Sequence, residues 1–502
     1  MSKKETYRKL FCSSTWNYET LLAADEVTHQ IGKNDFKLKV YPNQIEIVTS
    51  EQMLDAYSLI GLPTSYPHWK FGKDFVINQN NYSKGRMGLS YEMVINSNPC
   101  ISYNMENNTT AMMVLVIAHA CQGHNAFFAN NYFFKEWTSA DSIIDYMVFA
   151  RNYILKCEEE YGPEEVENIL DACHSLMNHG VDKYKKPHKL SAQEELERLK
   201  KLSEVKRQNY NELWKTIPKE NDMVLDSSLG SFPDEPEENL LYFIEKNAPT
   251  LEGWKREIIR IVRKVAQYFY PQGMTKVMNE GYATFMHYHI INKMFDEGYL
   301  DDGFMLEFMH SHSSVLYQPT YNSPHFSGLN PYTLGFNIFM DIKRICQNPT
   351  SEDKKWMPFL IGKDWLDQVN YAMGNFRDDS FLLQYLSPKV IRDMKLFAIS
   401  DFEKEKEYFI RAIHDEYGYQ QIRETLSEQY SRSNYVPDIQ IDKVEKHKSN
   451  RLFLTHNMAN GRRLDYNEAK STVDYLNFLW GFPVTLYSRN KLGVVENEFK
   501  VD

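Results

Sequence analysis

The chain has 502 residues, of which 42% are hydrophobic and 14% aromatic, and its formal net charge is -11 at pH 7. This length and composition predict a packed globular protein with a large core and two or three domains, and they exclude a disordered chain. The negative charge argues against general nucleic-acid binding, for which a basic surface is expected.

The sequence predicts no membrane span. It contains no run of about 18 uncharged apolar residues, and its first residues lack the apolar stretch of a secretion signal. The six cysteines are scattered and form no CxxC pair, which is typical of a reduced protein. We therefore expect a cytoplasmic location.

The N-terminal part mixes helical and extended patterns. Apolar spacing predicts a helix over residues 14–32, and alternation predicts a pair of short strands over 36–41 and 44–48. The aromatic segment 63–72 reads as a loop. It contains His68, a candidate for the wall of a substrate site, although such loops more often pack on the core.

Residues 92–103 predict a strand with a turn, and the apolar run 111–118 predicts a buried helix directly after it. In metallopeptidases of the zincin type, an edge strand near the metal-binding helix holds an extended substrate. We expect a comparable arrangement here by analogy.

The buried helix leads into two histidines, His119 and His124. On a regular helix their side chains would point roughly 140° apart. Gly123 permits a one-turn bulge, and such bulges occur mostly at functional sites. With one inserted residue the two rings can converge. Cys121 between them could be a ligand or nucleophile, but a small buried filler is favoured.

A second stretch, residues 278–287, carries Glu280 and His287. Seven residues apart, they lie about 20° from eclipsed on a helix and can face one centre. Together with the first pair they form a nitrogen and oxygen donor set suited to Zn²⁺, Mn²⁺ or Fe²⁺, with zinc as the first expectation. The alternative is a set of core histidines and a buried acid paired by hydrogen bonds.

The remaining sequence predicts mostly helices, with a break at Pro271. The charge-dense segment 183–235 is interpreted as a solvated helix and connector inserted into the main domain. Glu307 and His310 share the spacing of carboxylate-bridged metal sites, but a helix surface is favoured. The last part of the chain, 434–502, predicts a separate ββαβ domain.

Several long motifs resemble the SpoVR (stage V sporulation protein R) family, over most of the chain from about residue 17 to 480. They include HACQGHNAFF and NEGYATFMH, and they lie at residues 119–128, 279–287, 303–312, 317–319, 328–332, 364–367 and 384–389. The resemblance implies a link to spore cortex formation in spore formers. The family has no settled biochemical activity, and it also occurs in bacteria that never sporulate.

The HxxxGH order also resembles the HExxxH zinc motif of dipeptidyl peptidase III, and the Asn-Glu-Gly stretch resembles the third-ligand helix of gluzincin peptidases. One position departs from this pattern: Ala120 replaces the general-base glutamate, a group worth about 10² to 10⁴ in rate. The resemblance therefore favours a metal site over an ordinary protease.

These observations predict an α+β protein. Its main domain, residues 1–433, is predominantly helical with a zincin-like (gluzincin-like) core. The metal ligands are His119, His124 and Glu280, with His287 as a catalytic proton shuttle or a further ligand. The expected substrate-binding residues are His68, Asn125, His310 and His312.

Two functions remain open. The first is a metal-dependent hydrolase acting on a peptide or cell-wall (peptidoglycan or spore cortex) precursor. The second is a non-catalytic regulatory or adaptor protein in sporulation or stress response that uses the core as a scaffold and binds protein partners. A bound metal with an open coordination position favours the first, and a packed centre without metal favours the second.

Overall fold

The computed structural model describes residues 2–59, 62, 64–84, 91–184, 201, 232–233, 235–400, 409–431, 436–446, 449–458 and 461–502. The chain forms two compact units. The first comprises Met1–Glu165 and Tyr268–Tyr435, and the second comprises Val166–Gln267 and Val436–Asp502. Most of the charged segment 183–235 lies outside the described residues.

The first unit is built around helix α14 (Lys276–Asp296), which packs against a continuous helical rod and against α16 (Pro331–Gln347). The rod consists of α5 (Thr110–Ile117), the π-helix η1 (Ala118–His124) and α6 (Asn125–Asn130). Most residues of α14 are buried, and because residues 281–287 are all buried, this part of the helix is covered on every side. Such a helix belongs in the interior of a domain.

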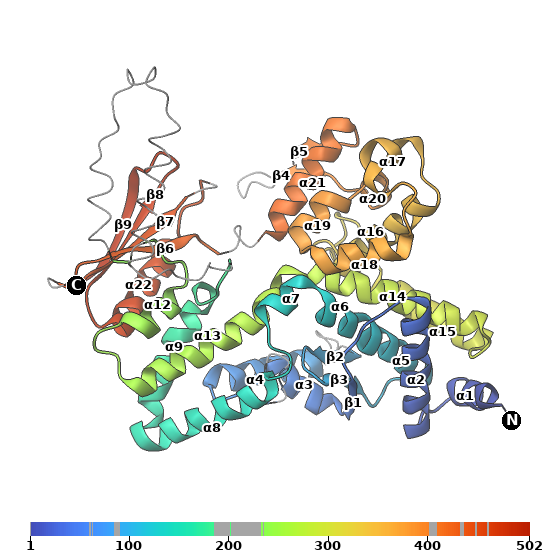
Figure 1. Cartoon of the computed structure of the whole chain (residues 1–502). Helices are drawn as coiled ribbons and strands as arrows, with labels where there is room; N and C mark the ends of the chain where they lie inside the picture. Colours follow the sequence, from blue (N-terminus) through green and yellow to red (C-terminus); the bar gives the residue numbers. More distant parts are fainter. Residues whose placement is uncertain are drawn as a thin grey trace. The chain divides into compact units, whose positions relative to one another are not determined.

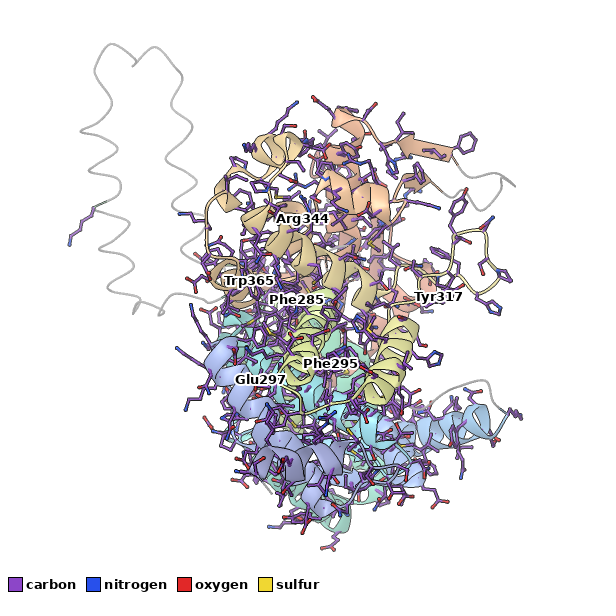
Figure 2. All side chains as sticks on the ribbon, turned by 90° about the vertical axis from the view of Figure 1, so that its right-hand side faces the viewer. Phe285, Phe295, Glu297, Tyr317, Arg344 and Trp365 are labelled. Carbon is purple, nitrogen blue, oxygen red and sulfur yellow. The ribbon has the colours of Figure 1, made fainter. Side chains whose placement is uncertain are left out.

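Aromatic packing continues from α14 to its neighbours. Phe285 of α14 lies against Trp365, the first residue of α18 (Trp365–Asn375), with 6.2 Å between ring centroids (Figure 2). The other helices of this unit are α1 (Lys3–Phe11), α2 (Tyr18–Asp35), α3 (Ser50–Ser58), α4 (Trp69–Ser83), α7 (Tyr132–Trp137), α8 (Ile143–Tyr161), α15 (Asp302–Val315), α17 (Ser351–Trp356), η4 (Pro358–Leu360), α19 (Asp378–Tyr385), α20 (Pro388–Asp393) and α21 (Glu416–Tyr430).

A small sheet flanks the rod. Its strands run in the order β1 (Asn43–Val48), β3 (Cys100–Met105), β2 (Glu92–Ile95). β1 pairs with β3 in parallel and β2 pairs with β3 in antiparallel register, so β2 is an edge strand of the described sheet. A further pair, β4 (Ala398–Ser400) and β5 (Phe409–Ala412), is antiparallel.

Three details of the predicted elements are corrected. Residues 36–41 form no strand, because Phe36 and Leu38 instead close the end of α2, where the Leu38 N–H donates to Gly32 O. Helix α4 begins inside the expected aromatic loop. Helix α13 (Gly253–Met274) continues past Pro271, which removes only one backbone hydrogen bond near the helix end.

The second unit contains a mixed sheet, whose strands run in the order β6 (Ile439–Val444), β7 (Leu452–Asn457), β8 (Val484–Arg489), β9 (Val495–Val501) (Figure 1). Helix α22 (Tyr466–Trp480) packs against β8 and β9. The predicted ββαβ order is present, extended by β9.

Residues earlier in the chain join this second unit. Besides parts of α9 (Pro163–Leu176) and α13, it includes η2 (Met177–His179) and α12 (Leu240–Asn247). Phe243 of α12 stacks on Trp480 of α22 at 5.9 Å.

Among the described residues, one stretch, Thr110–Asn130, is long and apolar enough to cross a membrane, and 94% of its qualifying 18-residue window is buried inside the protein. It is the rod at the centre of the first unit, so its apolar character is explained by the core around it. All six cysteines are free.

Candidate metal centre

The predicted helical bulge between the two histidines is confirmed. Residues 118–124 form a π-helical turn, and this turn brings the rings of His119 and His124 to 4.6 Å between centroids, edge to face. Both residues are buried, with 3% and 6% of their surface exposed. The inserted residue therefore cancels the angular separation that a regular helix would impose.

Gly123 is required for packing as well as for the turn. A Cβ atom at this position would lie 2.6 Å from Ala283 Cα in α14. Only glycine allows the π-helical turn and α14 to approach this closely, and the approach brings Glu280 to the histidines.

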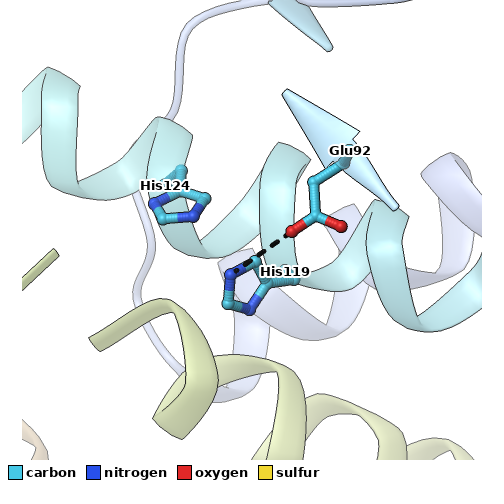
Figure 3. Close-up of side chains that lie close together, drawn as sticks. All are labelled: Glu92, His119 and His124. Atoms are coloured by element: carbon cyan, nitrogen blue, oxygen red, sulfur yellow. Dashed lines mark ion pairs between the residues drawn. The ribbon is translucent and has the colours of Figure 1, made fainter. Parts of the chain in front are cut away.

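Two carboxylates complete the cluster. Glu280 Oε2 of α14 lies 3.4 Å from His124 Nε2 and 4.0 Å from His119 Nε2. Glu92 Oε1, at the start of the edge strand β2, lies 3.7 Å from His119 Nε2 (Figure 3). One ligand atom each from Glu92, His119 and His124 lies within 4.8 Å of the others.

These spacings suit a shared metal ion better than direct hydrogen bonds. His119 Nε2 and Glu280 Oε2 are buried without a hydrogen-bond partner in the protein. Ligands about 2.1 Å from a tetrahedral ion lie about 3.4 Å from one another. The observed separations of 3.4 to 4.0 Å are close to this value and are too long for good hydrogen bonds.

Burial controls the charge of the cluster. It raises the pKa of Glu92 to about 8, with a smaller contribution from the neighbouring Glu280 carboxylate. Burial, and then the surrounding histidines, hold the pKa of His119 well below its usual value. The His119 ring is therefore neutral at pH 7, which is the form that binds metals.

Hydrogen bonds behind the histidines fix their ring orientation. His124 Nδ1 donates to Asn279 Oδ1 at 3.0 Å, which leaves the lone pair on Nε2 facing Glu280. His119 Nδ1 lies 2.8 Å from His287 Nδ1. Partners of this kind behind a ligand are typical of metal-binding histidines.

His287 itself lies one layer behind the cluster. One ring nitrogen contacts His119, and the other lies 2.9 Å from His312 Nδ1. Both its nitrogens are thus engaged by other histidines. That His287 supplies a ligand or shuttles protons at the centre stays a prediction; its contacts place it directly behind the ring of His119.

Tyr332, at the start of α16, covers the other side of the cluster. Its ring stacks on His119 at 6.2 Å between centroids, and its hydroxyl interacts electrostatically with the Glu280 and Glu92 carboxylates. Burial, followed by the two nearby glutamates, raises its pKa above the usual range, so the phenol stays protonated.

The cluster opens into a cavity of about 1030 Å³. Its wall combines the polar cluster with apolar and aromatic side chains from several elements, including Tyr57, Met93, Met112, Leu115, Phe128, His312, Val315 and Tyr332. This size and mixed lining are typical of sites for organic ligands.

Of the expected substrate-binding residues, only His312 lines this cavity. His68 caps α4, where its Nδ1 accepts from Lys70 N, and it packs on Trp69. The Asn125 side chain is bonded to the backbone of Tyr41 at 2.8 Å, and so ties the rod to the strand region.

His310 lies on the exposed face of α15, as does Glu307, which accepts a hydrogen bond from Thr109. The helix-surface interpretation of this pair is confirmed. Cys121 is buried, and burial raises its pKa well above the usual value, which agrees with a filler role.

Sequence reasoning did not find Glu92, Asn279 or Tyr332. Asn279 and Tyr332 lie in motifs that resemble the SpoVR family, and these motifs are the sequence signal that could have identified them. Glu92 had only its place at the start of the predicted strand before the histidine helix.

Comparisons with known proteins agree with the resemblance. The family described as "SpoVR like protein" matches residues 15–435, and the family described as "SpoVR-like C-terminal domain" matches residues 437–491. The chain is 54% identical over 461 residues to "Uncharacterized protein YcgB" of Escherichia coli (strain K12), which covers 92% of this chain and 90% of the relative. No solved structure matches. The chain belongs to the SpoVR family.

Proposed function

We propose that the protein binds one divalent metal ion, zinc first, through His119, His124 and Glu280. The observation that carries this proposal is the convergence of these groups while His119 Nε2 and Glu280 Oε2 stay buried without a protein partner. Burying such atoms unpaired costs about 1 to 3 kcal/mol each, a cost that a bound cation would remove.

The donor set fits zinc. Two histidines and one carboxylate are the protein ligands of many catalytic zinc sites, which keep a fourth position open. An ion held here would act as a Lewis acid that polarises a carbonyl and acidifies water. Asn279 and His287 would hold the two imidazoles in the ligating tautomer.

We further propose that the centre hydrolyses a bond in a peptide or cell-wall precursor, and that its core is zincin-like. The arrangement in support is an edge strand beside the histidine helix, with a glutamate on a later helix. Ala120 lacks the carboxylate expected of a general base, but Glu92 brings a carboxylate to the same cluster from the edge strand. Tyr332 adds a hydroxyl donor facing the centre.

The cavity supports a substrate of intermediate size. Its volume, about 1030 Å³, lies near the upper end of the usual range for small-molecule sites, and its apolar and aromatic wall suits a short peptide segment. A cytoplasmic location belongs to the same proposal, since all six cysteines are free.

The second candidate is a regulatory or adaptor protein with a metal-stabilised core. The observation that favours it is Ala120, which is fully buried in the hydrophobic core where the peptidases carry their base. Both candidate functions include the metal site, but only the first includes catalytic turnover of a substrate.

The test is metal analysis of the full chain, purified without a histidine tag or chelators. We expect about one equivalent of zinc in the wild type and less than about a tenth of this in His119→Ala, His124→Ala and Glu280→Ala. His289→Ala is the matched control. It removes a partly buried histidine of α14, the helix that carries Glu280, and the nitrogens of His289 contact Phe285 O and Lys343 instead of the cluster. Wild-type protein that neither carries nor takes up zinc would overturn the proposal.

A further inference from the structure

Three buried histidines from three helices form a chain that ends at the candidate metal centre. His119 Nδ1 lies 2.8 Å from His287 Nδ1, and His287 Nε2 lies 2.9 Å from His312 Nδ1. The three residues belong to η1, α14 and α15. His287 and His312 are 1% and 4% exposed, so water does not replace these contacts.

A neutral imidazole has one N–H and one acceptor nitrogen, so the chain has only two fully hydrogen-bonded orderings. In the first, His119 Nδ1 donates to His287, and His287 Nε2 donates to His312. This ordering leaves the lone pair of His119 Nε2 facing the two glutamates.

In the second ordering every bond is reversed: His312 donates to His287, and His287 donates to His119. His119 Nε2 then carries the hydrogen. It would point toward Glu92 and Glu280, whose nearest oxygens are 3.7 and 4.0 Å away, too far for a hydrogen bond. A metal ion requires the first ordering, because only a lone pair can ligate.

We infer that His287 and His312 are positioning residues that hold His119 in the metal-ligating tautomer. This inference rests on the proposed metal site and goes beyond it, because it extends the positioning role from His287 to His312, which does not contact His119 and is not a proposed ligand. His312 also lines the cavity. A ligand that hydrogen-bonds His312 therefore shifts the balance between the two orderings, as metal binding does. The ligand and the metal ion then change each other's affinity by the same factor.

Two substitutions of His312 have different expected effects on zinc affinity. His312→Asn places an amide oxygen where Nδ1 accepts, so the first ordering is preserved. His312→Phe keeps an aromatic ring among Phe308, Tyr288 and Phe336 but removes the acceptor. Zinc affinity, measured by competition with a chromophoric chelator, should fall about 10- to 100-fold in His312→Phe and in His287→Phe. Zinc affinity in His312→Asn should stay within about threefold of wild type, clearly below the 10- to 100-fold loss expected for His312→Phe.

A second readout distinguishes positioning from a merely structural role. In the metal-free protein labelled with ¹⁵N at histidine, the His119 signals, assigned by their loss in His119→Ala, should report hydrogen on Nδ1. In His312→Phe they should report a mixture of tautomers.

Equal zinc affinity in His312→Phe and wild type would overturn the inference while leaving the metal site intact. Equal losses in His312→Asn and His312→Phe would also overturn it, because packing would then explain both. Absence of zinc binding in the wild type would instead overturn the proposed function. If His287→Phe does not fold, the His312 pair still decides the matter.

Discussion

Glu92 Oε1 lies 3.7 Å from His119 Nε2, and the two residues belong to an edge strand and a π-helical turn. Neither the strand nor the helix contains the whole cluster. A carboxylate thus reaches the candidate centre from the neighbouring sheet, in an environment that raises its pKa to about 8.

Glu92→Gln should change how stability depends on pH. The folded pKa of about 8 lies above the unfolded value of 4.5, so the folded state keeps a proton that the unfolded chain releases. Stability of the metal-free protein should therefore fall as pH rises from 6.5 to 8, by up to about 1.4 kcal/mol per pH unit for this one group. Glu92→Gln should remove the part of this pH dependence of the unfolding free energy that is due to Glu92.

Urea unfolding with a chelator present, at intervals of pH across this window, measures the effect. Burial holds the folded pKa values of His119 and His287 well below the usual value, and their contribution to the pH dependence is common to both proteins, so it cancels in the comparison. Asp378, with a pKa of about 7, contributes equally to both proteins. Parallel curves for wild type and Glu92→Gln would contradict the assigned pKa.

Ala120→Glu tests whether the centre is a peptidase site that lacks its base. Ala120 is fully buried in the hydrophobic core, so we expect the new carboxylate to destabilise the fold by several kcal/mol rather than to create turnover. Zinc content, melting temperature and hydrolysis of a mixed peptide substrate are the measurements. Gain of hydrolysis with zinc retained would show that position 120 still faces the reacting bond, contrary to this expectation.

Gly281→Ala should disrupt the crossing of α14 and α16. A Cβ atom there would lie 2.4 Å from the Gly335 backbone, which cannot turn aside as a flexible side chain can. We expect a loss of at least about 1 to 3 kcal/mol in unfolding free energy, together with weaker zinc binding because Glu280 precedes this residue. The matched control is Gly273→Ala in α13, where no atom lies within 4 Å. It should be neutral or stabilising by up to about 1 kcal/mol.

Asp378 anchors the start of the helix that carries Glu280. Its two carboxylate oxygens accept hydrogen bonds from Val277 N and Met278 N at 2.8 and 2.9 Å. Asp378→Asn sets an amide N–H against one of these donors, so unfolding free energy should fall by about 1 to 3 kcal/mol. Asp393→Asn, which breaks only a surface ion pair with Lys389, should cost less than about 1 kcal/mol. Equal effects of the two substitutions would refute the anchoring role.

Removal of residues 434–502 tests the proposed division of the chain. All donors of the candidate centre belong to the first compact unit, so the shortened protein should keep cooperative unfolding and stoichiometric zinc. Its second unit should be destabilised, because Phe243 loses the ring of Trp480. Calorimetry and metal analysis give the readouts, and loss of zinc together with soluble fold would show that the tail is integral to the main domain.

Family membership, the buried apolar rod and the convergence of His119 with His124 could be predicted from the sequence. These features are local: a run of apolar residues identifies a buried helix, and a glycine beside a misplaced histidine indicates an inserted residue. The order of elements in the C-terminal sheet is local in the same sense, because alternation and helical spacing are encoded within each segment.

Only the tertiary structure decided which other groups meet the histidine pair. Helical spacing placed Glu280 and His287 on similar faces of α14, but it could not state that one reaches the centre and the other lies behind His119. Glu92 joined the cluster because β2 pairs with β3 beside the rod. Such contacts depend on how close two elements approach, and that distance is set by the side chains between them, above all by the missing Cβ atoms at Gly123 and Gly281.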